Sequence, residues 1–202
     1  MQFYLLQKHT MDKGEKQIMN KIIVVVGMCG VGKTVACDYL ESLGLERIYF
    51  GAITFEKLQE AGLEDSPENE RMMREKLRDE GGMGVFATLN LPKLEKLVEK
   101  GNVVVESLYS WDELKIVQDK FGEQVVTVSI VADKELRYSR LAKRDIRPFT
   151  RDEAIKRDIT EIENIAKAGP IAYADYFIDN NGTVAEFQQR LDNLVENINK
   201  NE

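Results

Sequence analysis

The sequence contains few of the residues that build metal clusters, disulfides or membrane spans. Its 202 residues include two cysteines and one histidine, which form no recognisable metal-ligand pattern. The cysteines, Cys29 and Cys37, lie too far apart along one predicted element to form a disulfide, as is typical of a reduced compartment. No apolar stretch approaches the ~20 residues that a membrane-spanning helix needs. These absences favour a cytoplasmic protein without a membrane segment.

The charge balance excludes further classes of partner. The chain has 28 basic and 35 acidic residues and a net charge of −7. Because nucleic acids and membrane surfaces attract an excess of positive charge, we expect neither as a partner. The length suffices for one sizeable core. We therefore expect a single domain that acts as a monomer or a homodimer.

The first twenty residues differ from the rest of the chain. Residues 1–20 are polar apart from Phe3-Tyr4-Leu5-Leu6, a patch too short for a secretory signal. We expect the domain to occupy residues 21–202, with a disordered or non-native extension before it and Met19 as an alternative start; a short docked helix is the other interpretation. His9 lies in this extension and is expected to be solvated.

One motif dominates the sequence, a match to the phosphate-binding pattern G-x-x-x-x-G-K-[ST]. It follows the β-branched run 22–26 and precedes a predicted helix that ends before Gly44. In this context, backbone N–H groups surround a polyphosphate at a helix N-terminus. Lys33 is then expected to reach the β- and γ-phosphates, and the Thr34 hydroxyl to ligate Mg²⁺. A glycine-rich turn that matches by chance is the alternative. The predicted nucleotide-binding residues here are Gly27, Met28, Cys29, Gly30, Val31, Gly32, Lys33, Thr34 and Val35.

Beyond the motif, strand-like and helical segments alternate. The further strand candidates are 48–50, 103–105, 125–131 and 176–178. Helix starts are predicted at Ser66-Pro67 and at three capping boxes that begin at Ser110, Thr150 and Thr183. This alternation predicts an α/β fold with a parallel sheet covered on both faces, whose ligands collect at the carboxyl ends of the strands.

One connection is longer than a crossover requires. The stretch of about residues 52–100 is rich in helix-forming residues, whereas a crossover needs about a dozen residues. We expect it to contain an inserted helical subdomain that binds an acceptor molecule. Within it, Arg71, Arg74 and Arg78 share one helical face. Surface ion pairs explain Arg71 and Arg74 as well as a functional role does. Arg78 instead adjoins the turn that begins at Gly81, so Arg78 and Gly81 are predicted to bind substrate.

Arginines are concentrated after the fourth predicted strand. They recur at steps of three and four, as Arg137, Arg140, Arg144, Arg147 and Arg151. We expect a helix that carries the first three, then a short lid over about residues 140–151. Arg147 precedes Pro148 and is expected to be extended. Because phosphoryl transfer depends on neutralising charge, Arg140, Arg144 and Arg147 are predicted to be catalytic, with a solvated basic helix as the alternative.

The third predicted strand ends in a carboxylate, Glu106. At the catalytic edge of the sheet this group is predicted to hold Mg²⁺ or to accept a proton from a hydroxyl. It is otherwise the first polar residue beyond the sheet. Tyr109 is predicted to bind the acceptor, and Trp111 is a second candidate, although buried packing explains both.

These motifs together resemble the P-loop kinases of the nucleoside-monophosphate-kinase class, nearest to the dephospho-CoA-kinase-like and adenylate-kinase-related members. The resemblance extends from about Lys21 to near the C-terminus. It depends on the Gly27–Thr34 loop, the strand that ends at Glu106, the arginines before Pro148, and the segment 174–183, which reads ADYFIDNNGT.

The resemblance implies a three-layer fold around a five-stranded parallel sheet of order 2-3-1-4-5. It implies MgATP as the phosphoryl donor and a nucleotide or a CoA precursor as the small-molecule acceptor. Asn181 and Gly182 would then border the adenine pocket.

Two positions depart from the pattern of such kinases. Ala52 stands where a carboxylate often follows glycine, and Glu106-Ser107 stands where aspartate and glycine are usual. The sequence therefore leaves open whether catalysis is impaired. An NTPase without a small-molecule acceptor, or a nucleotide-binding regulator, is the alternative function.

Overall fold

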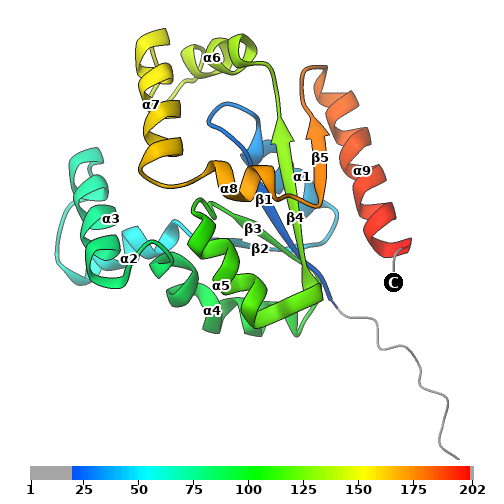
Figure 1. Cartoon of the computed structure of the whole chain (residues 1–202), viewed down its shortest axis with the longest axis horizontal. Coiled ribbons are helices and arrows are strands. Elements are labelled where there is room, and N and C mark those ends of the chain that lie inside the picture. The colour runs from blue at the N-terminus through cyan, green and yellow to red at the C-terminus, as the bar shows by residue number, and fades with distance from the viewer. Residues whose placement is uncertain (1–19, 201–202) are drawn as a thin grey trace, which may run out of the picture.

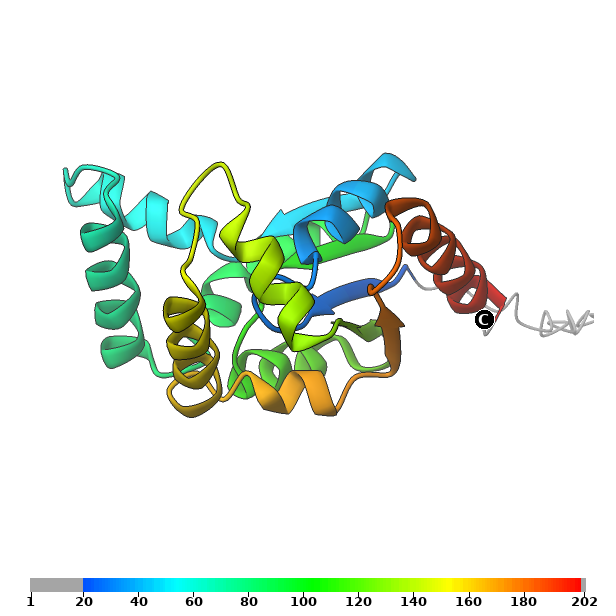
Figure 2. The ribbon, with the colours of Figure 1, turned by 90° about the horizontal axis from the view of Figure 1, so that it is seen from above.

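The computed structural model describes residues 20–200 of the chain, so the predictions for Phe3–Leu6, His9 and Met19 lie outside the described residues. A five-stranded parallel sheet lies between layers of helices (Figures 1 and 2). The strands are β1 (Ile22–Val26), β2 (Glu46–Tyr49), β3 (Val103–Glu106), β4 (Val125–Val131) and β5 (Tyr176–Asp179). The helices are α1 (Lys33–Ser42), α2 (Ala52–Glu60), α3 (Pro67–Gly81), α4 (Val85–Val98), α5 (Trp111–Phe121), the short 3₁₀ turn η1 (Gly122–Gln124), α6 (Lys134–Ala142), α7 (Arg151–Glu163), α8 (Ala168–Ala172) and α9 (Val184–Lys200).

The strand order is β2-β3-β1-β4-β5, which confirms the predicted topology. In the register, Ile22 of β1 pairs with Val103 on one side and Val125 on the other. The strand β2 is displaced from its predicted position, since it begins at Glu46 and ends at Tyr49. The reason is its pairing with β3, which extends from Glu46 opposite Val103 to Tyr49 opposite Glu106.

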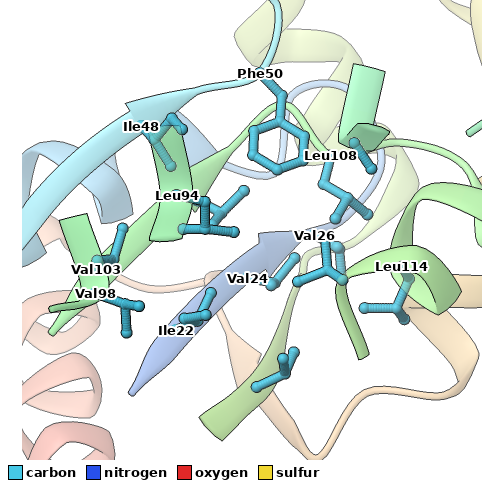
Figure 3. Close-up of a cluster of buried hydrophobic side chains, with 14 residues drawn as sticks. Ile22, Val24, Val26, Ile48, Phe50, Leu94, Val98, Val103, Leu108 and Leu114 are labelled. Carbon is cyan, nitrogen blue, oxygen red and sulfur yellow. The ribbon is translucent and has the colours of Figure 1, made fainter. Parts of the chain in front are cut away.

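The two faces of the sheet explain why β1 has no polar residue. On one face, Ile22, Val24 and Val26 pack with Leu94 of α4 and Leu114 of α5 (Figure 3). On the other face, the alternate residues of β1 pack against α1 and α9. Because successive side chains of a strand point to opposite faces, a strand covered on both sides is apolar throughout. This sandwich fixes the carboxyl edge on which the motif residues lie.

The helix starts follow the predicted caps. Ser66 accepts a hydrogen bond from the backbone of Asn69 at the start of α3, and capping boxes begin α5 at Ser110 and α7 at Thr150. The hydroxyl of Thr183 accepts the N–H of Glu186 at the start of α9. These local hydrogen bonds satisfy N–H groups that a helix leaves free at its first turn.

The long connection between β2 and β3 consists of α2, α3 and α4. Residues of all three helices form a small core of their own, which contains Leu58, Leu77 and Phe86. The helix α4 also covers the main sheet through Leu94 and Val98. The projecting part is therefore α2 with α3, which stands to one side of the sheet in Figure 2. We refer to α2 and α3 as the insertion.

The segment between α6 and α7 corrects two predictions. The helix that was expected to carry Arg144 ends at Ala142, because the chain turns back and the N–H of Phe149 bonds to the carbonyl of Leu141. Phe149 then packs against the cluster that joins α6 to α7. We refer to residues 143–150, between these helices, as the lid.

The second correction concerns Arg147, which was expected to be extended before Pro148. Its φ is 52°, in the left-handed region that L-residues rarely adopt. Its guanidinium forms two hydrogen bonds with Glu70 of α3, at 2.7 and 3.4 Å. This contact with a distant helix outweighs the local preference before proline.

Within residues 20–200, no helix is both long and apolar enough to cross a membrane.

Candidate functional site

The phosphate-binding loop connects β1 to α1 at the carboxyl edge of the sheet. Gly27 and Gly32 have φ values of 142° and 96°. A β-carbon on Gly27 would lie 2.5 Å from the carbonyl oxygen of Ile130, and one on Gly32 would lie 2.5 Å from the side-chain nitrogen of Asn180. Both positions therefore require glycine, because the loop passes tightly between β4 and the residue that follows β5.

Lys33 crosses the loop from the first turn of α1. Its Nζ donates hydrogen bonds to the carbonyl oxygens of Gly27 and Met28 at 2.9 and 3.1 Å. Burial and then the positive charge of Lys167 lower the pKa of Lys33 to about 7. Since a nearby anion favours the charged form of lysine, a bound polyphosphate would raise this pKa again. The site therefore favours an anion beside Lys33.

Thr34 and Glu106 meet at the same edge. The Thr34 hydroxyl donates a hydrogen bond to Oε1 of Glu106 at 2.9 Å, and Glu106 is 8% exposed. The strand β3 places the carboxylate there because β3 is the neighbour of β1 in the sheet. A hydroxyl and a carboxylate beside a phosphate site provide the hard oxygen donors that Mg²⁺ prefers.

Arg47 of β2 orients this carboxylate. Its Nε donates to Oε2 of Glu106 at 3.1 Å, and its Nη2 bonds to the same oxygen. Its Nη1 bonds to Asp38 and Glu41 on α1. Arg47 therefore occupies one oxygen of Glu106 and leaves Oε1 directed at Thr34.

The donor set fits Mg²⁺ rather than a metal held entirely by protein side chains. In residues 20–200, no group of three or more histidine, cysteine, aspartate or glutamate residues could hold a metal ion. Mg²⁺ is commonly bound through one or two protein oxygens together with substrate phosphates and water. Thr34 and Glu106 would supply those protein oxygens.

The arginines after β4 have different environments. Arg137 is buried, and its two terminal nitrogens bond to Asp158 of α7 at 3.0 and 2.6 Å. Its Nη1 also donates to the carbonyl of Cys29 at 2.9 Å, so Arg137 fixes the phosphate-binding loop to α7. Arg151 instead pairs with Glu135 on the surface. These two arginines are occupied by structural contacts.

Arg140 and Arg144 have fewer contacts with protein carboxylates and are more available to a ligand. Nη2 of Arg140 donates to the carbonyl of Asn180 at 2.8 Å, while its Nη1 is buried without a hydrogen-bond partner in the described part of the chain. Arg144 is exposed in the lid, and its positive charge contributes to the lowered pKa of Lys33. Arg140 is thus joined to the phosphate-binding loop through Asn180, whose side chain bonds to Val31.

The segment after β5 contacts the loop through Asn180. Its side-chain nitrogen donates to the carbonyl of Val31 at 2.7 Å, and it is 7% exposed. The neighbouring residue Asn181 accepts a hydrogen bond from the backbone of Asp133 at 2.8 Å, and Gly182 follows it. The predicted nucleotide-side residues are therefore joined to the loop by Asn180.

On the acceptor side, Arg78 is partly buried at the end of α3. Its guanidinium lies 5.2 Å from the centre of the Phe86 ring. Its Nε is buried with no hydrogen-bond partner among residues 20–200, and burial lowers its pKa while the charge of Glu113 opposes this. Gly81, predicted to approach a substrate, belongs to the same helix, where a β-carbon would lie 2.5 Å from Val85.

The two aromatic candidates, Tyr109 and Trp111, lie in different environments. The Tyr109 hydroxyl lies 3.0 Å from Oγ of Ser107, and burial raises the pKa of Tyr109 to about 12. Ser107 has a φ of 66° directly after Glu106, which turns the chain towards Tyr109. Trp111 packs edge-to-face on Tyr173, with ring centres 5.2 Å apart. Tyr109 therefore adjoins the Glu106 edge, and Trp111 packs against the segment after α8.

A charged cluster on α7 and before α8 was not predicted from the sequence. Oε2 of Glu161 accepts a hydrogen bond from Nζ of Lys167 at 2.6 Å, and Oε1 accepts one from Nε of Arg157 at 2.8 Å. Nζ of Lys167 lies 4.5 Å from the centre of the Tyr109 ring. The cluster thus adjoins the acceptor-side aromatic residue, and burial and the charge of Lys167 lower the pKa of Lys33.

The sequence carried weak signals for the unpredicted residues. Arg47 lies just before the predicted strand 48–50, and Lys167 is the one charged residue of the stretch 165–172, which reads IAKAGPIA. Their roles depend on contacts across 59 and 6 positions respectively, the first of which no local pattern specifies.

Comparisons with known proteins agree with this geometry. The family model described as "AAA domain" matches residues 23–163. A UPF0200 protein of Pyrococcus horikoshii is 32% identical over 184 residues, which cover 89% of this chain and 98% of that protein. A shikimate kinase from Bacteroides thetaiotaomicron has a TM-score of 0.56 at 18% identity and covers 87% of this chain and 98% of its own. A dephospho-CoA kinase from Campylobacter jejuni has a TM-score of 0.52 at 18% identity, with coverages of 88% and 97%. At these identities the likeness to the two kinases shows the fold alone, which is the P-loop kinase fold.

Proposed function

Because the chain belongs to the UPF0200 family and to the AAA-domain family, and has a P-loop kinase fold, we propose that it is an ATP-dependent small-molecule kinase. It transfers the γ-phosphate of ATP to a hydroxyl of a nucleotide or a CoA precursor. The bond from the γ-phosphorus to the β–γ bridging oxygen breaks, a bond to the acceptor oxygen forms, and the hydroxyl proton is released.

The donor half of the mechanism depends on the loop and its neighbours. The backbone from Gly27 to Thr34 binds the polyphosphate, and Lys33 exchanges its carbonyl partners for phosphate oxygens. Thr34 and Glu106 would hold Mg²⁺, which when bound neutralises charge on the β- and γ-phosphates. Asn181 and Gly182 would border the adenine.

Glu106 serves the metal rather than the acceptor proton in this proposal. Arg47 donates two hydrogen bonds to its Oε2, and Thr34 donates one to its Oε1. These donors already occupy both oxygens of the carboxylate, which leaves fewer lone pairs for the proton of an acceptor hydroxyl. In contrast, charge-assisted hydrogen bonds fix the orientation that metal ligation requires.

Arg140 and Arg144 neutralise charge on the transferred group. Arg147 connects the lid to the insertion through its hydrogen bonds with Glu70. Phosphoryl transfer gains most from such positioned cations. Arg140 keeps one nitrogen on Asn180 and has a second that is buried without a hydrogen-bond partner in the part of the chain that the structure describes. That free donor supports a role towards a ligand.

The observation that carries the proposal is the buried, unpartnered Nε of Arg78 in the insertion. A buried polar group without a partner is costly, so an anionic acceptor that supplies one explains its position beside the Phe86 ring at the end of α3. An insertion in which a buried guanidinium nitrogen has no hydrogen-bond partner among residues 20–200 fits a kinase better than an NTPase without an acceptor.

The test is ADP release from MgATP with a panel of nucleoside monophosphates, deoxynucleotides and dephospho-CoA. One class of acceptor should stimulate turnover strongly, and Arg78→Gln should raise the KM for that acceptor by about tenfold or more. The matched control is Lys76→Gln, an exposed cation on the same helix, which should leave KM unchanged. Absence of stimulation by every acceptor contradicts the proposal.

One observation favours the alternative, a nucleotide-binding regulator or an NTPase without a small-molecule acceptor. Ala52 begins α2 beside the site and has no carboxylate to help hold an acceptor. In that case basal ATP hydrolysis would be independent of every acceptor, and Arg78→Gln would not alter it.

A further inference from the structure

The helix α7 has its polar and apolar sides in the reverse of the usual order. The side turned to the protein interior carries Ala154, Asp158 and Glu161, which are all buried. Ile159 and Ile162 lie on another side of the helix, and each is 48% exposed. A surface helix of a globular protein normally turns its apolar side to the core. In α7 the apolar side is instead left half uncovered by the rest of residues 20–200.

Buried ion pairs fix this orientation of α7. Asp158 accepts hydrogen bonds from Arg137 at 3.0 and 2.6 Å, and Glu161 accepts one from Lys167 at 2.6 Å. If the helix turned its isoleucines inward, these carboxylates would leave their partners, and a buried charge that loses its partner is strongly destabilising. The exposure of the isoleucines is therefore maintained by the fold.

The exposed side of α7 is also hollowed. One hollow of about 440 Å³ is lined by Ile155, Lys156 and Ile159 among other residues of α7. A second, of about 510 Å³, is lined by Ile162 and by Tyr173 after α8. Apolar surfaces that stay exposed in this way mark sites of protein interaction. We refer to Ile155, Ile159 and Ile162 as the isoleucine strip.

Two opposite charges flank the isoleucine strip at matching distances. Lys156 precedes Ile159 by three positions, and Glu163 follows Ile159 by four, so each lies about one helical turn from it. Positions seven apart share one side of a helix, so both charges border the same edge of the strip. Both residues are exposed, and neither side chain forms an ion pair within the part of the chain that the structure describes.

This arrangement of charges is complementary to itself. In a two-fold dimer each copy presents the same patch to the other. If two α7 helices pack antiparallel across Ile159, Lys156 of one copy lies opposite Glu163 of the second copy, and the same pair forms again on the other side of the axis. Ile162 of one copy then lies between Ile155 and Ile159 of the second copy. A partner of any other kind would require no such symmetry.

We propose that the isoleucine strip is a dimer interface, occupied by the isoleucine strip of a second copy of this chain in antiparallel orientation. Burial of the isoleucines drives the association, and the pairs between Lys156 and Glu163 fix its orientation. The second copy then packs on the helix that supports the phosphate-binding loop, because Asp158 of α7 binds Arg137, which donates to the carbonyl of Cys29 at 2.9 Å. The interface itself does not depend on the kinase activity proposed above.

The experiment measures the dimer dissociation constant of the full-length protein by sedimentation equilibrium, from micromolar to submillimolar concentrations. The parent should dimerise within this range. Lys156→Glu and Glu163→Lys should each raise the dissociation constant by about tenfold or more, because each places like charges opposite one another on both sides of the axis. The double variant, which exchanges the two charges, should return the constant to within about threefold of the parental value.

Two further variants complete the series. Lys93→Glu reverses an exposed charge on α4 and should leave the dissociation constant within about twofold of the parental value. Ile159→Glu should give a monomer, with circular dichroism as the check that it is folded; if it is not, the exchange of charges decides. A parent that stays monomeric overturns the inference, as does a dimer that the single reversals do not weaken or that the exchange does not restore. None of these measurements requires nucleotide, so failure of the proposed function would be seen separately, in the assay of ADP release.

Discussion

Arg147 in the lid donates a hydrogen bond to the buried carboxylate of Glu70 in α3 at 2.7 Å. Glu70 also accepts a hydrogen bond from Arg74 at 3.0 Å, so one carboxylate joins the lid to the insertion. The hydrogen bond from Arg147, followed by that from Arg74, lowers the pKa of Glu70 against the opposing effect of burial. This contact bridges the two segments that would enclose an acceptor.

The first prediction concerns this contact. Arg147 is 57% exposed on its side chain, so Arg147→Ala should cost only about 0–1 kcal/mol of the free energy of unfolding. Turnover should fall by roughly 10–100-fold, because the lid is no longer positioned over the acceptor. Urea denaturation and steady-state kinetics measure the two effects. Arg147→Lys should be intermediate, since lysine keeps the charge and loses the planar fork. Parental turnover in Arg147→Ala would show that the contact serves no reaction.

The same pair has a predicted pH dependence. Because the pKa of Glu70 is lowered in the fold, its contribution to stability is complete above its unfolded pKa of about 4.3. That contribution decreases as the pH falls through the folded pKa. Glu70→Gln should therefore reduce the free energy of unfolding at pH 7 and reduce it less at pH 3.5. Equal differences at the two pH values would contradict the assignment.

Substitutions of Arg140 and Arg144 should lower turnover far more than they lower the free energy of unfolding. Arg140→Ala and Arg144→Ala should each lower kcat by about 100-fold or more, if they neutralise the transferred group. Arg140→Ala should also cost about 1 kcal/mol of stability, because the carbonyl of Asn180 loses its donor. Arg151→Ala is the matched control, since Arg151 pairs with Glu135 on the surface. Normal turnover in both variants would leave Arg140 and Arg144 without a catalytic role.

The metal prediction depends on the contact between Arg47 and Glu106. EDTA should abolish turnover, and Glu106→Gln should raise the Mg²⁺ concentration for half-maximal rate by about tenfold or more. Arg47→Gln should raise it in the same direction and by less, since Glu106 keeps its charge but loses its fixed orientation. A Mg²⁺ titration at saturating ATP measures both. A Mg²⁺ requirement that stays unchanged in Glu106→Gln would exclude Glu106 as a ligand.

Nucleotide binding should stabilise the fold through Lys33. At a ligand concentration of 100 times Kd, MgATP should add about 2.7 kcal/mol, which corresponds to a rise in Tm of roughly 5–10 °C. Lys33→Ala should remove most of that rise. Absence of any shift in the parent protein at millimolar MgATP would contradict the proposed donor site.

The lowered pKa of Lys33 also predicts that the stability of the nucleotide-free protein depends on pH. Its pKa is about 7 in the fold and 10.5 ordinarily, so between these values the unfolded state binds more protons than the folded state. Stability should therefore rise with pH across this window. Lys33→Met should lose that rise when the two proteins are compared by urea denaturation at pH 7 and pH 9. A difference between them that does not change with pH would show that Lys33 titrates normally.

Local features of the sequence determined much of the fold. The β-branched run 22–26 could only be a strand covered on both faces, and the caps at Ser66, Ser110 and Thr150 each act within three residues of themselves. The strand order was inferred from the resemblance to a kinase class, and the structure confirms it. The phosphate-binding loop was predictable for the same local reason, since glycine backbone freedom and the neighbouring helix are encoded in adjacent residues.

The tertiary structure alone decided which charged side chains meet. Arg137 and Arg140 lie on one helix and share one spacing pattern, yet the first is bound to Asp158 and the second has a buried nitrogen without a hydrogen-bond partner in the described residues. The conformation of Arg147 departs from the local preference before proline because its guanidinium binds Glu70. Glu70 lies 77 positions away in the sequence, so no local pattern predicts this contact. An ion pair depends on the distance between two side chains in space, and that distance is set by the packing of whole helices against the sheet.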